Sequence, residues 1–285
     1  MKTAADSLQA GAAPGTGEVL ADQQWLRAHL DDPSVRVIEV DVSPAAYNDW
    51  HIDGAVLWNV YADLKDAAYQ TADTVALQRL VASSGIGPDT TVVFYGYAPA
   101  LGLWLMRLYG HREVRILDCS RDTWRAEGHP WTTAAAEPPP GTLQLGSEDP
   151  RIRAGQATVR DAIGRPGTTL LDVRSVAEYQ GECFWPSGGM EPGGRAGHVP
   201  SAIHQPVSDL YNPDGSFRSA PELRGVFSPD VLDADGELIT YCTIGGRAAT
   251  AWFVLTYLLG RDKVRVYDGS WAEWGRDPAT RVACP

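Results

Sequence analysis

Residues 241–248 read Tyr-Cys-Thr-Ile-Gly-Gly-Arg-Ala and join two segments of different periodicity. The preceding run, residues 237–241, is short and apolar, as in a buried strand. Residues 248–259 have the apolar spacing of a helix, which we expect to end at Gly260. Cys242 is therefore expected where a strand gives way to a tight turn. Backbone N–H groups and the helix dipole favour a thiolate there, so the pattern predicts a nucleophile, although such a cysteine can also be a small buried apolar residue.

The composition is that of a globular chain with more than one domain. Its 285 residues suggest about two domains, and 44% hydrophobic with 21% charged residues can form sizeable cores. The formal net charge of −12 argues against a nucleic-acid partner. No apolar run approaches the roughly 20 residues that span a bilayer, so we expect no membrane partner. We expect a disordered tail over residues 1–17 and no signal peptide.

The cysteines indicate neither a disulfide framework nor a metal site. Four cysteines in a chain of this length are too few for such a framework, and the sequence has no C-x-x-C pair or His/Cys cluster of the kind that binds zinc. We therefore expect a reducing, cytoplasmic setting, no metal and no other cofactor. The four are Cys119, Cys183, Cys242 and Cys284.

The two halves of the chain repeat one order of segments. Asp118 lies eight positions after Gly110, Asp268 lies eight positions after Gly260, and both glycines lie fourteen positions before a tryptophan. Equal intervals with matching residue types indicate a duplicated unit. The predicted segments are a helix over 22–30, a strand over 35–42, a helix over 74–84, a strand over 91–95, a helix over 100–109 and a strand over 114–118 in the first half, and strands over 169–173, 238–241 and 264–268 in the second.

Each half alternates strands with helices, which predicts a small α/β domain built on a parallel sheet. We expect an N-terminal domain over residues 18–135 and a C-terminal domain over 151–285. The proline-rich segment 136–150 between them is typical of a semi-rigid linker. Ligand sites in such sheets lie beyond the carboxyl ends of the strands, where Cys242 is expected.

The repeats differ at two places that bear on function. In the first half the loop after the central strand is shorter, and Gly96 stands where Cys242 would fall. The first half therefore lacks the nucleophile. The second half carries an extra segment over residues 180–197, which contains Cys183, Trp185 and Arg195.

Several motifs together carry a family resemblance. They are Gly-His-Val-Pro-Ser-Ala at 197–202 with a weaker counterpart at 51–55, Asp-Val-Arg-Ser at 172–175, the Cys242 loop, and Val-Tyr-Asp-Gly-Ser-Trp at 266–271. In this order, and largely twice over, the chain resembles a tandem-domain rhodanese. That sulfurtransferase family includes thiosulfate and 3-mercaptopyruvate sulfurtransferases. The resemblance implies an α/β fold of two tandem rhodanese-like domains, each a small parallel sheet flanked by helices, with an inactive N-terminal domain packed on a catalytic C-terminal one.

The resemblance also implies a ping-pong reaction through a persulfide. The Cys242 thiolate would take the outer sulfur of a small anionic donor, thiosulfate or 3-mercaptopyruvate. It would pass that sulfur to cyanide or to a thiol acceptor such as thioredoxin, a small thiol or a sulfur-accepting protein. The loop N–H groups would cradle the anionic persulfide. The loop residues are Thr243, Ile244, Gly245, Gly246 and Arg247.

Three arginines are candidates for donor binding. Arg247 closes the loop, and its planar fork suits a sulfonate or carboxylate. Likeness to the mercaptopyruvate branch implies that Arg174 and Arg195 bind the substrate carboxylate; the alternative for both is a salt bridge to a nearby acid (Asp172, Glu178 or Glu191). Thiosulfate enzymes of the family often place Arg and Lys directly after the cysteine, and mercaptopyruvate enzymes often have Gly-Ser-Gly. The Thr-Ile-Gly-Gly-Arg loop matches neither, so the donor stays open.

Other residues have competing interpretations. Tyr241, Thr243 and Ile244 are expected to form pocket wall, and His51 and His198 are expected to be structural. Cys183 is either a resolving or relay thiol or an ordinary cysteine.

Two other functions remain as alternatives to a sulfurtransferase. Phosphatase-type sites have five residues between cysteine and arginine, whereas four separate Cys242 from Arg247, so we expect no phosphatase activity. The other alternative is a non-catalytic or partner-dependent sulfur carrier or regulatory module in a biosynthetic pathway.

Overall fold

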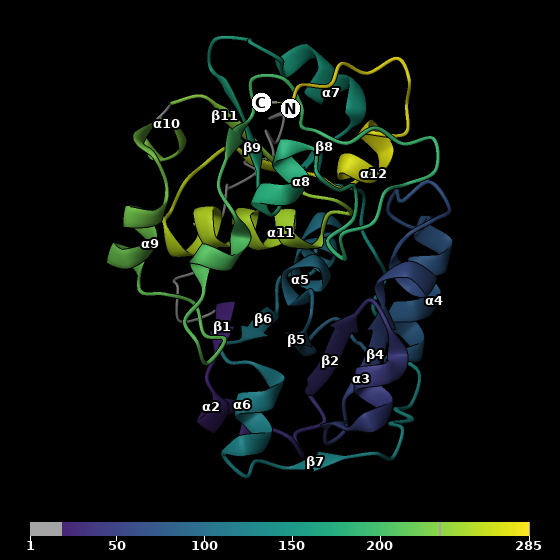
Figure 1. The fold of residues 1–285 in the computed structure, drawn as a ribbon. Coiled ribbons are helices and arrows are strands. Elements are labelled where there is room, and N and C mark those ends of the chain that lie inside the picture. The colour runs from purple at the N-terminus through teal and green to yellow at the C-terminus, as the bar shows by residue number, and fades with distance from the viewer. Residues whose placement is uncertain (1–18, 234, 285) are drawn as a thin grey trace, which may run out of the picture.

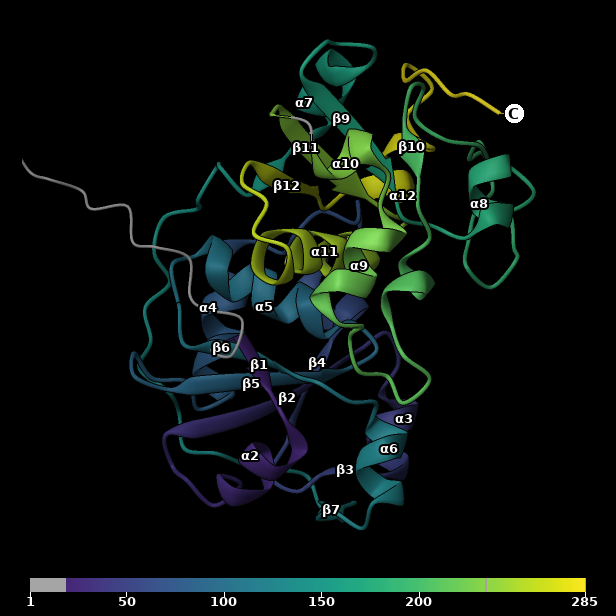
Figure 2. The ribbon, with the colours of Figure 1, turned by 90° about the vertical axis from the view of Figure 1, so that its left-hand side faces the viewer.

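The computed structural model describes residues 19–233 and 235–284, so the tail expected over 1–17 lies outside the described part. Figure 1 shows two α/β lobes, with the first half of the chain below and the second half above. Each lobe has a parallel sheet, and helices α5 (Pro99–Leu108) and α11 (Gly246–Phe253) lie between the two sheets (Figure 2). The predicted pair of α/β units is therefore present.

The two sheets have the same strand order. The N-terminal sheet has the order β1-β6-β5-β2-β4, and the C-terminal sheet has β8-β12-β11-β9-β10. All neighbouring strands in both sheets are parallel. The strands are β1 (Leu20–Ala21), β2 (Val35–Asp41), β4 (Val56–Asn59), β5 (Thr91–Gly96), β6 (Val114–Leu117), β8 (Arg153–Ala154), β9 (Thr168–Asp172), β10 (Ile203–His204), β11 (Glu237–Tyr241) and β12 (Val264–Tyr267), with a separate antiparallel pair β3 (His51–Ile52) and β7 (Trp131–Thr132).

The helices follow the apolar spacing of the sequence, and the predicted elements are confirmed to within about two residues. The largest deviation is in the predicted helix 248–259, which begins two residues earlier as α11 and continues as the π-helical η3 (Val254–Leu258) before Gly260. The other helical segments are α2 (Gln23–Ala28), α3 (Pro44–Asp49), η1 (Val60–Leu64), α4 (Thr74–Ser83), α6 (Arg121–Ala126), α7 (Gln156–Ala162), α8 (Val176–Gln180), η2 (Val207–Leu210), α9 (Ala220–Val226), α10 (Pro229–Leu232) and α12 (Ser270–Trp274). Among the helices of the described part, none has the length and apolar character needed to cross a membrane.

Helices α5 and α11 explain how the lobes hold together. Both are buried nearly all round, with Pro99, Arg107 and Arg247 as their only residues that are not buried. A helix that is apolar on every face must pack on both sides. Each helix covers the sheet of its own lobe, and the two helices pack against each other. The interface between the lobes is therefore part of the hydrophobic core.

Each lobe also reaches into the other with a short hairpin. One is closed by a bridge between Lys65 and Thr71, and the other by a bridge between Tyr211 and Phe217. The Thr71 N–H donates to the carboxylate of Asp268 at 3.0 Å, and the Phe217 N–H donates to that of Asp118 at 2.8 Å. The hairpins are therefore exchanged symmetrically between the lobes, as expected for a duplication.

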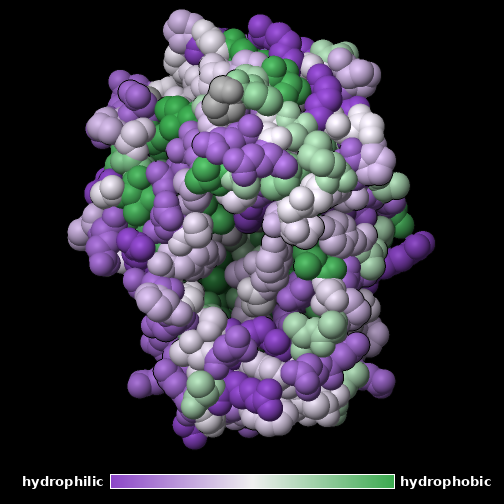
Figure 3. Space-filling model, in the orientation of Figure 1, coloured by the Kyte–Doolittle hydropathy of each residue, from purple (hydrophilic) through white to green (hydrophobic). Residues whose placement is uncertain are grey.

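The segment 136–150 has no regular helix or strand and runs along the N-terminal lobe. The Leu143 N–H donates to the carbonyl of Ile86 at 3.0 Å, and the Gly146 N–H donates to that of Tyr109 at 2.9 Å. On the face shown in Figure 3, a hollow lies near the middle of the molecule, and hydrophobic side chains are visible in it among a largely hydrophilic surface.

Candidate active site

The Cys242 loop connects β11 to α11 and is fixed by the start of α12. The Cys242 N–H donates to Ser270 Oγ at 3.1 Å, and the Trp271 N–H donates back to the Cys242 carbonyl at 3.0 Å. Gly245 has φ +95°, and a Cβ there would lie 2.8 Å from the carbonyl oxygen of Asp268. Only glycine fits this position, because both the backbone angle and the space exclude a side chain.

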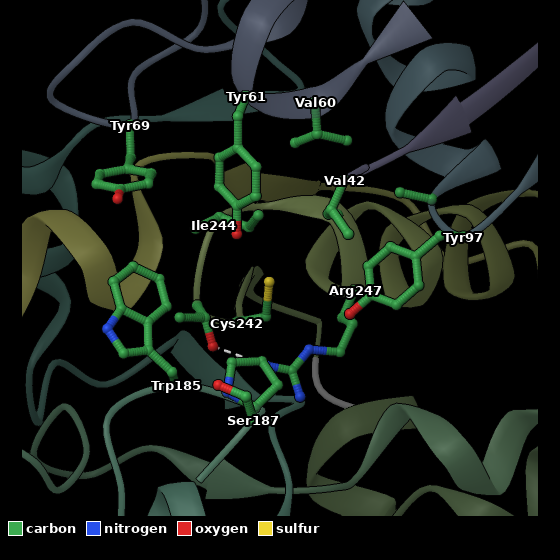
Figure 4. Close-up of a pocket in the computed structure, with 14 residues that line it drawn as sticks. Val42, Val60, Tyr61, Tyr69, Tyr97, Trp185, Ser187, Cys242, Ile244 and Arg247 are labelled. Carbon is green, nitrogen blue, oxygen red and sulfur yellow. Dashed lines mark hydrogen bonds between the residues drawn. The ribbon is translucent and has the colours of Figure 1, made fainter. Parts of the chain in front are cut away.

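The loop directs a donor at the sulfur. The Gly245 N–H donates to Cys242 Sγ at 3.1 Å, and α11 begins at the next residue. Cys242 is only 1% exposed, yet its sulfur points into a pocket (Figure 4). The hydrogen bond and the positive end of the helix both favour a negative charge on this sulfur.

The pocket over Cys242 has a volume of about 490 Å³ and is built by both lobes. Its walls are mainly aromatic and apolar, and the labelled side chains in Figure 4 surround the sulfur. The N-terminal lobe contributes Val42, Val60, Tyr61, Tyr69, Tyr97 and Ala98, the extra segment contributes Trp185, Pro186 and Ser187, and the loop contributes Cys242, Thr243, Ile244, Gly246 and Arg247.

Arg247 lines the pocket, but its charge is already paired. Its two terminal nitrogens donate to the two carboxylate oxygens of Glu178 at 2.8 Å each. Thr243 Oγ1 donates to the same carboxylate at 2.5 Å. Burial raises the pKa of Glu178, but the hydrogen bonds and charge of Arg247, together with Thr243 and Ser175, lower it to about 2. Glu178 is therefore ionised at neutral pH, and the planar fork of Arg247 is occupied by a carboxylate of the protein.

Arg174 and Arg195 lie outside the pocket in structural networks. Arg174 is fully buried and forms a bidentate pair with Asp172, with its Nη2 2.6 Å from Oδ2. It also donates to the carbonyl of Gly197 at 2.6 Å. Arg195 donates to the Thr280 carbonyl at 2.7 Å. Arg174 thus matches the salt-bridge alternative, and the geometry gives no support to carboxylate binding by either arginine.

The repeated histidine motif is a pair of equivalent structural networks. His51 stacks on Tyr47, and His198 stacks on Tyr179; in each pair an imidazole Nδ1 bonds to the tyrosine carbonyl, at 2.8 and 2.9 Å. Neither histidine lines the pocket.

Tyr241 does not line the pocket either, contrary to expectation, because its hydroxyl is buried and accepts the N–H of Val199 at 3.0 Å.

Cys183 also lies outside the pocket lining. Its side chain is buried, and burial raises the pKa of its thiol. Such an environment favours the protonated form.

The N-terminal counterpart of the loop leaves little room for a side chain in place of Gly96. Gly96 has φ +100°, and a Cβ there would lie 3.0 Å from both Glu39 Cγ and the Val40 carbonyl oxygen. The shorter loop instead sends Tyr97 and Ala98 into the pocket of the other lobe.

The sequence pattern did not predict the aromatic wall from the N-terminal lobe or the partner of Arg247. Tyr61 and Tyr69 lie in the exchanged hairpin region, far from Cys242 in the chain. Glu178 follows Ser175 by three residues, which is the signature of a helix capping box, and the box is indeed formed. The capping box accounts for Glu178 from the sequence alone, so its second role, the pairing with Arg247, could not be predicted.

A model of the Rhodanese-like domain matches residues 22–127 and again 156–277. The chain belongs to the rhodanese family. The predicted family and its fold of two tandem rhodanese-like domains are thereby confirmed.

Relatives of this rhodanese carry two kinds of name. This chain is 39% identical over 267 residues to the sulfur carrier protein TtuD of Thermus thermophilus, and the match covers 90% of this chain and 94% of that protein. It is 37% identical over 268 residues to a Haloferax volcanii protein named "Putative thiosulfate sulfurtransferase", covering 90% and 93%. These relatives place the chain among the rhodanese sulfurtransferases without deciding its donor or acceptor.

Solved structures share the fold at lower identity. An anaerobic ergothioneine biosynthesis enzyme from Chlorobium limicola matches with a TM-score of 0.79 and 22% identity, over 94% of this chain and 70% of that chain. The 3-mercaptopyruvate sulfurtransferase SseA from Escherichia coli matches with a TM-score of 0.76 and 23% identity, over 88% and 98%.

Proposed function

We propose that this rhodanese moves a sulfane sulfur from a small anionic donor to a thiol acceptor through a persulfide on Cys242. The observation that carries the proposal is the Gly245 N–H on Cys242 Sγ at the floor of a pocket of about 490 Å³. This backbone N–H, directed at the sulfur, stabilises the thiolate before the reaction and the anionic persulfide after it.

The reaction has two displacements at sulfur. The Cys242 thiolate attacks the outer sulfur of thiosulfate, the S–S bond of the donor breaks, and sulfite leaves with the bonding pair. An acceptor thiolate then attacks the terminal sulfur of the persulfide, which releases the Cys242 thiolate and gives the acceptor persulfide. With 3-mercaptopyruvate the C–S bond breaks instead, and the leaving carbanion takes a proton to become pyruvate.

Thiosulfate is the donor we favour. The mercaptopyruvate interpretation needs Arg174 and Arg195 for a carboxylate. Arg174 is held in a buried network and Arg195 in a partly buried one, and neither lines the pocket. The Haloferax volcanii relative is named for thiosulfate. For the acceptor we favour an organic thiol over cyanide, because the pocket is much larger than one small anion and its walls are aromatic. A reducing compartment such as the cytoplasm suits this chemistry, since all four cysteines are free thiols.

A partner-dependent sulfur carrier is the second candidate. It is favoured by the name of the Thermus thermophilus relative and by the pairing of Arg247 with Glu178, which leaves no unpaired arginine of the pocket lining for a small dianion. In that case the persulfide would form from a protein donor, and turnover with thiosulfate would be slow.

One set of assays separates these functions. Thiosulfate and 3-mercaptopyruvate are compared as donors in steady state with a dithiol acceptor, using Cys242→Ser and Cys183→Ser as matched variants. Intact-protein and peptide masses after donor treatment locate the added sulfur. We expect turnover with thiosulfate, one sulfur on Cys242, loss of both in Cys242→Ser and retention in Cys183→Ser. A persulfide that forms only with a desulfurase would select the carrier. Full activity in Cys242→Ser would refute the persulfide mechanism.

A further inference from the structure

Lys65 lies beneath the Cys242 loop, although it belongs to the N-terminal lobe. Its side chain is 1% exposed, and its Nζ donates to the carbonyl oxygen of Asp268 at 2.9 Å. A Cβ on Gly245 would lie 3.2 Å from the same Nζ. Since the Gly245 N–H is the donor to Cys242 Sγ, the ammonium group lies against the residue that holds the sulfur.

The charge of Lys65 is only partly neutralised by its partner. Its Nζ is 3.7 Å from the Asp268 carboxylate, longer than a hydrogen bond. That carboxylate is already bonded to the Thr71 N–H and hydroxyl, at 3.0 and 2.5 Å, and to Arg153 at 3.0 Å. Arg153 also pairs with Glu148 at 2.9 Å. Of the two cations beside Asp268, Lys65 is the one that lies against Gly245 of the loop.

The other ionisable groups around Cys242 do not supply a net positive charge. From the loop side, Arg247 is cancelled by the ionised Glu178. From the N-terminal lobe, Tyr61 and Tyr97 are 45% and 55% exposed, and their partial burial raises the pKa values of both. Both hydroxyls therefore stay protonated and neutral at physiological pH. Arg247 is also near enough to interact with a charged Cys242, but its guanidinium is bonded to Glu178. Within the part of the chain that the structure describes, the ammonium of Lys65 donates to a carbonyl oxygen and to no carboxylate.

The duplication gives an independent comparison. Lys65 closes one exchanged hairpin, and Tyr211 holds the same position in the other. Tyr211 faces a small cavity that Gly96 also lines, at the loop that has no cysteine. A cation therefore stands at this position in the hairpin that faces the nucleophile and is absent from the one that faces the glycine.

We propose that Lys65 is an electrostatic positioning residue, supplied by the catalytically inactive lobe, that stabilises the negative charge of Cys242. The coupling is reciprocal. Burial lowers the pKa of Lys65, whereas Asp268 and a charged Cys242 raise it. The attraction between the two charges is mutual. A Cys242 thiolate stabilises the Lys65 ammonium, and the ammonium stabilises the thiolate by the same free energy. The persulfide part of this role rests on the proposed function; the thiolate part does not.

The test measures the ionisation of Cys242 without sulfur transfer. Iodoacetamide alkylation of Cys242 is followed against pH by peptide mass in a Cys284→Ser background, which removes the exposed cysteine. We expect Lys65→Met to slow alkylation of Cys242 at pH 7 about tenfold, because the loss of a nearby positive charge disfavours the thiolate. Lys65→Gln, which is also neutral but can still donate to a carbonyl, should act in the same direction and covers the case that Lys65→Met does not fold.

Thr71→Val is the matched control. It removes the Thr71 hydroxyl from the same Asp268 carboxylate without changing any charge, so it should leave the alkylation rate of Cys242 at the wild-type value. An unchanged alkylation rate in the Lys65 variants, or an equal change in Thr71→Val, overturns the proposal. Slower alkylation in the Lys65 variants of a chain that transfers no sulfur would remove the proposed function and leave this inference standing.

Discussion

The loops that follow β5 and β11 occupy equivalent places in two sheets of the same strand order, yet one carries Cys242 and the other has a crowded glycine, Gly96, at the matching place. After β11 the chain has room for Cys242 and for a turn that directs an N–H at its sulfur. After β5 the shorter turn begins at Gly96, where a side chain would meet Glu39 and Val40. The two lobes therefore share one scaffold, and the first lobe contributes residues to the site of the second. Tyr61 and Tyr97 line the pocket, and Lys65 bonds to Asp268 beside the Cys242 loop.

The largest effect should come from a change to the turn that distinguishes the two loops. Gly245→Ala places a methyl group in a left-handed backbone position, 2.8 Å from the Asp268 carbonyl oxygen, and so displaces the N–H from Cys242 Sγ. We expect sulfur transfer to fall about a hundredfold, in the range seen when one preorganised donor is lost. Steady-state kinetics with thiosulfate measures it.

Gly260→Ala is the control for that change. Gly260 also has positive φ, but a Cβ there has nothing within 4 Å, so it reports backbone strain alone. Near-wild-type activity in Gly245→Ala would mean that the turn does not stabilise the sulfur.

Glu178→Gln tests whether the paired arginine holds the second loop in shape. The change leaves the guanidinium of Arg247 without its bidentate carboxylate, which we expect to cost about 3 kcal/mol of unfolding free energy at pH 7. Since the pKa of Glu178 is lowered to about 2, its contribution is present above the ordinary carboxyl range and is lost as the pH falls from about 4.5 to about 2.

Urea unfolding at several pH values measures both consequences. The wild-type chain should lose more stability than Glu178→Gln between neutral pH and pH 3, so the two curves converge in acid. Parallel curves would show that the folded chain does not hold Glu178 ionised.

Local pattern predicted most of the scaffold and the position of Cys242 between a strand and a helix. The strand, glycine turn and helix around Cys242 follow from neighbouring residues, and the duplication is visible as repeated intervals. The remaining site depends on contacts between residues far apart in the chain. Lys65 and Gly245 meet only because hairpins are exchanged between lobes. The family resemblance predicts that Arg174 binds substrate. In the structure Arg174 instead forms a bidentate pair with Asp172, two residues earlier.

The aromatic wall supplied by the first lobe should affect the acceptor more than the donor. Tyr61 is 45% exposed at the pocket, where its ring can pack against an organic thiol. We expect Tyr61→Ala to raise KM for an aromatic thiol about fivefold, the scale of one aromatic contact. The rate of persulfide formation from thiosulfate should not change.

Two variants control for that prediction. Tyr61→Phe keeps the ring and should behave as wild type. Trp131→Ala removes a similarly exposed ring on β7, away from the pocket lining, and should have no effect on KM. An equal rise in KM with cyanide as acceptor would show that Tyr61 acts on the site in general and not on the acceptor.

The smallest effect should come from restoring a thiol to the first loop. Gly96→Cys in a Cys242→Ser background should gain no sulfur from thiosulfate, because a Cβ at this left-handed position lies 3.0 Å from both Glu39 and Val40. We expect only a loss of about 1–2 kcal/mol of stability from the left-handed backbone. Gly110→Cys, also at positive φ but with open space around its Cβ, separates that backbone cost from crowding. A persulfide on the thiol introduced at position 96, seen by peptide mass, would show that the first lobe lost only its cysteine and still has a competent loop.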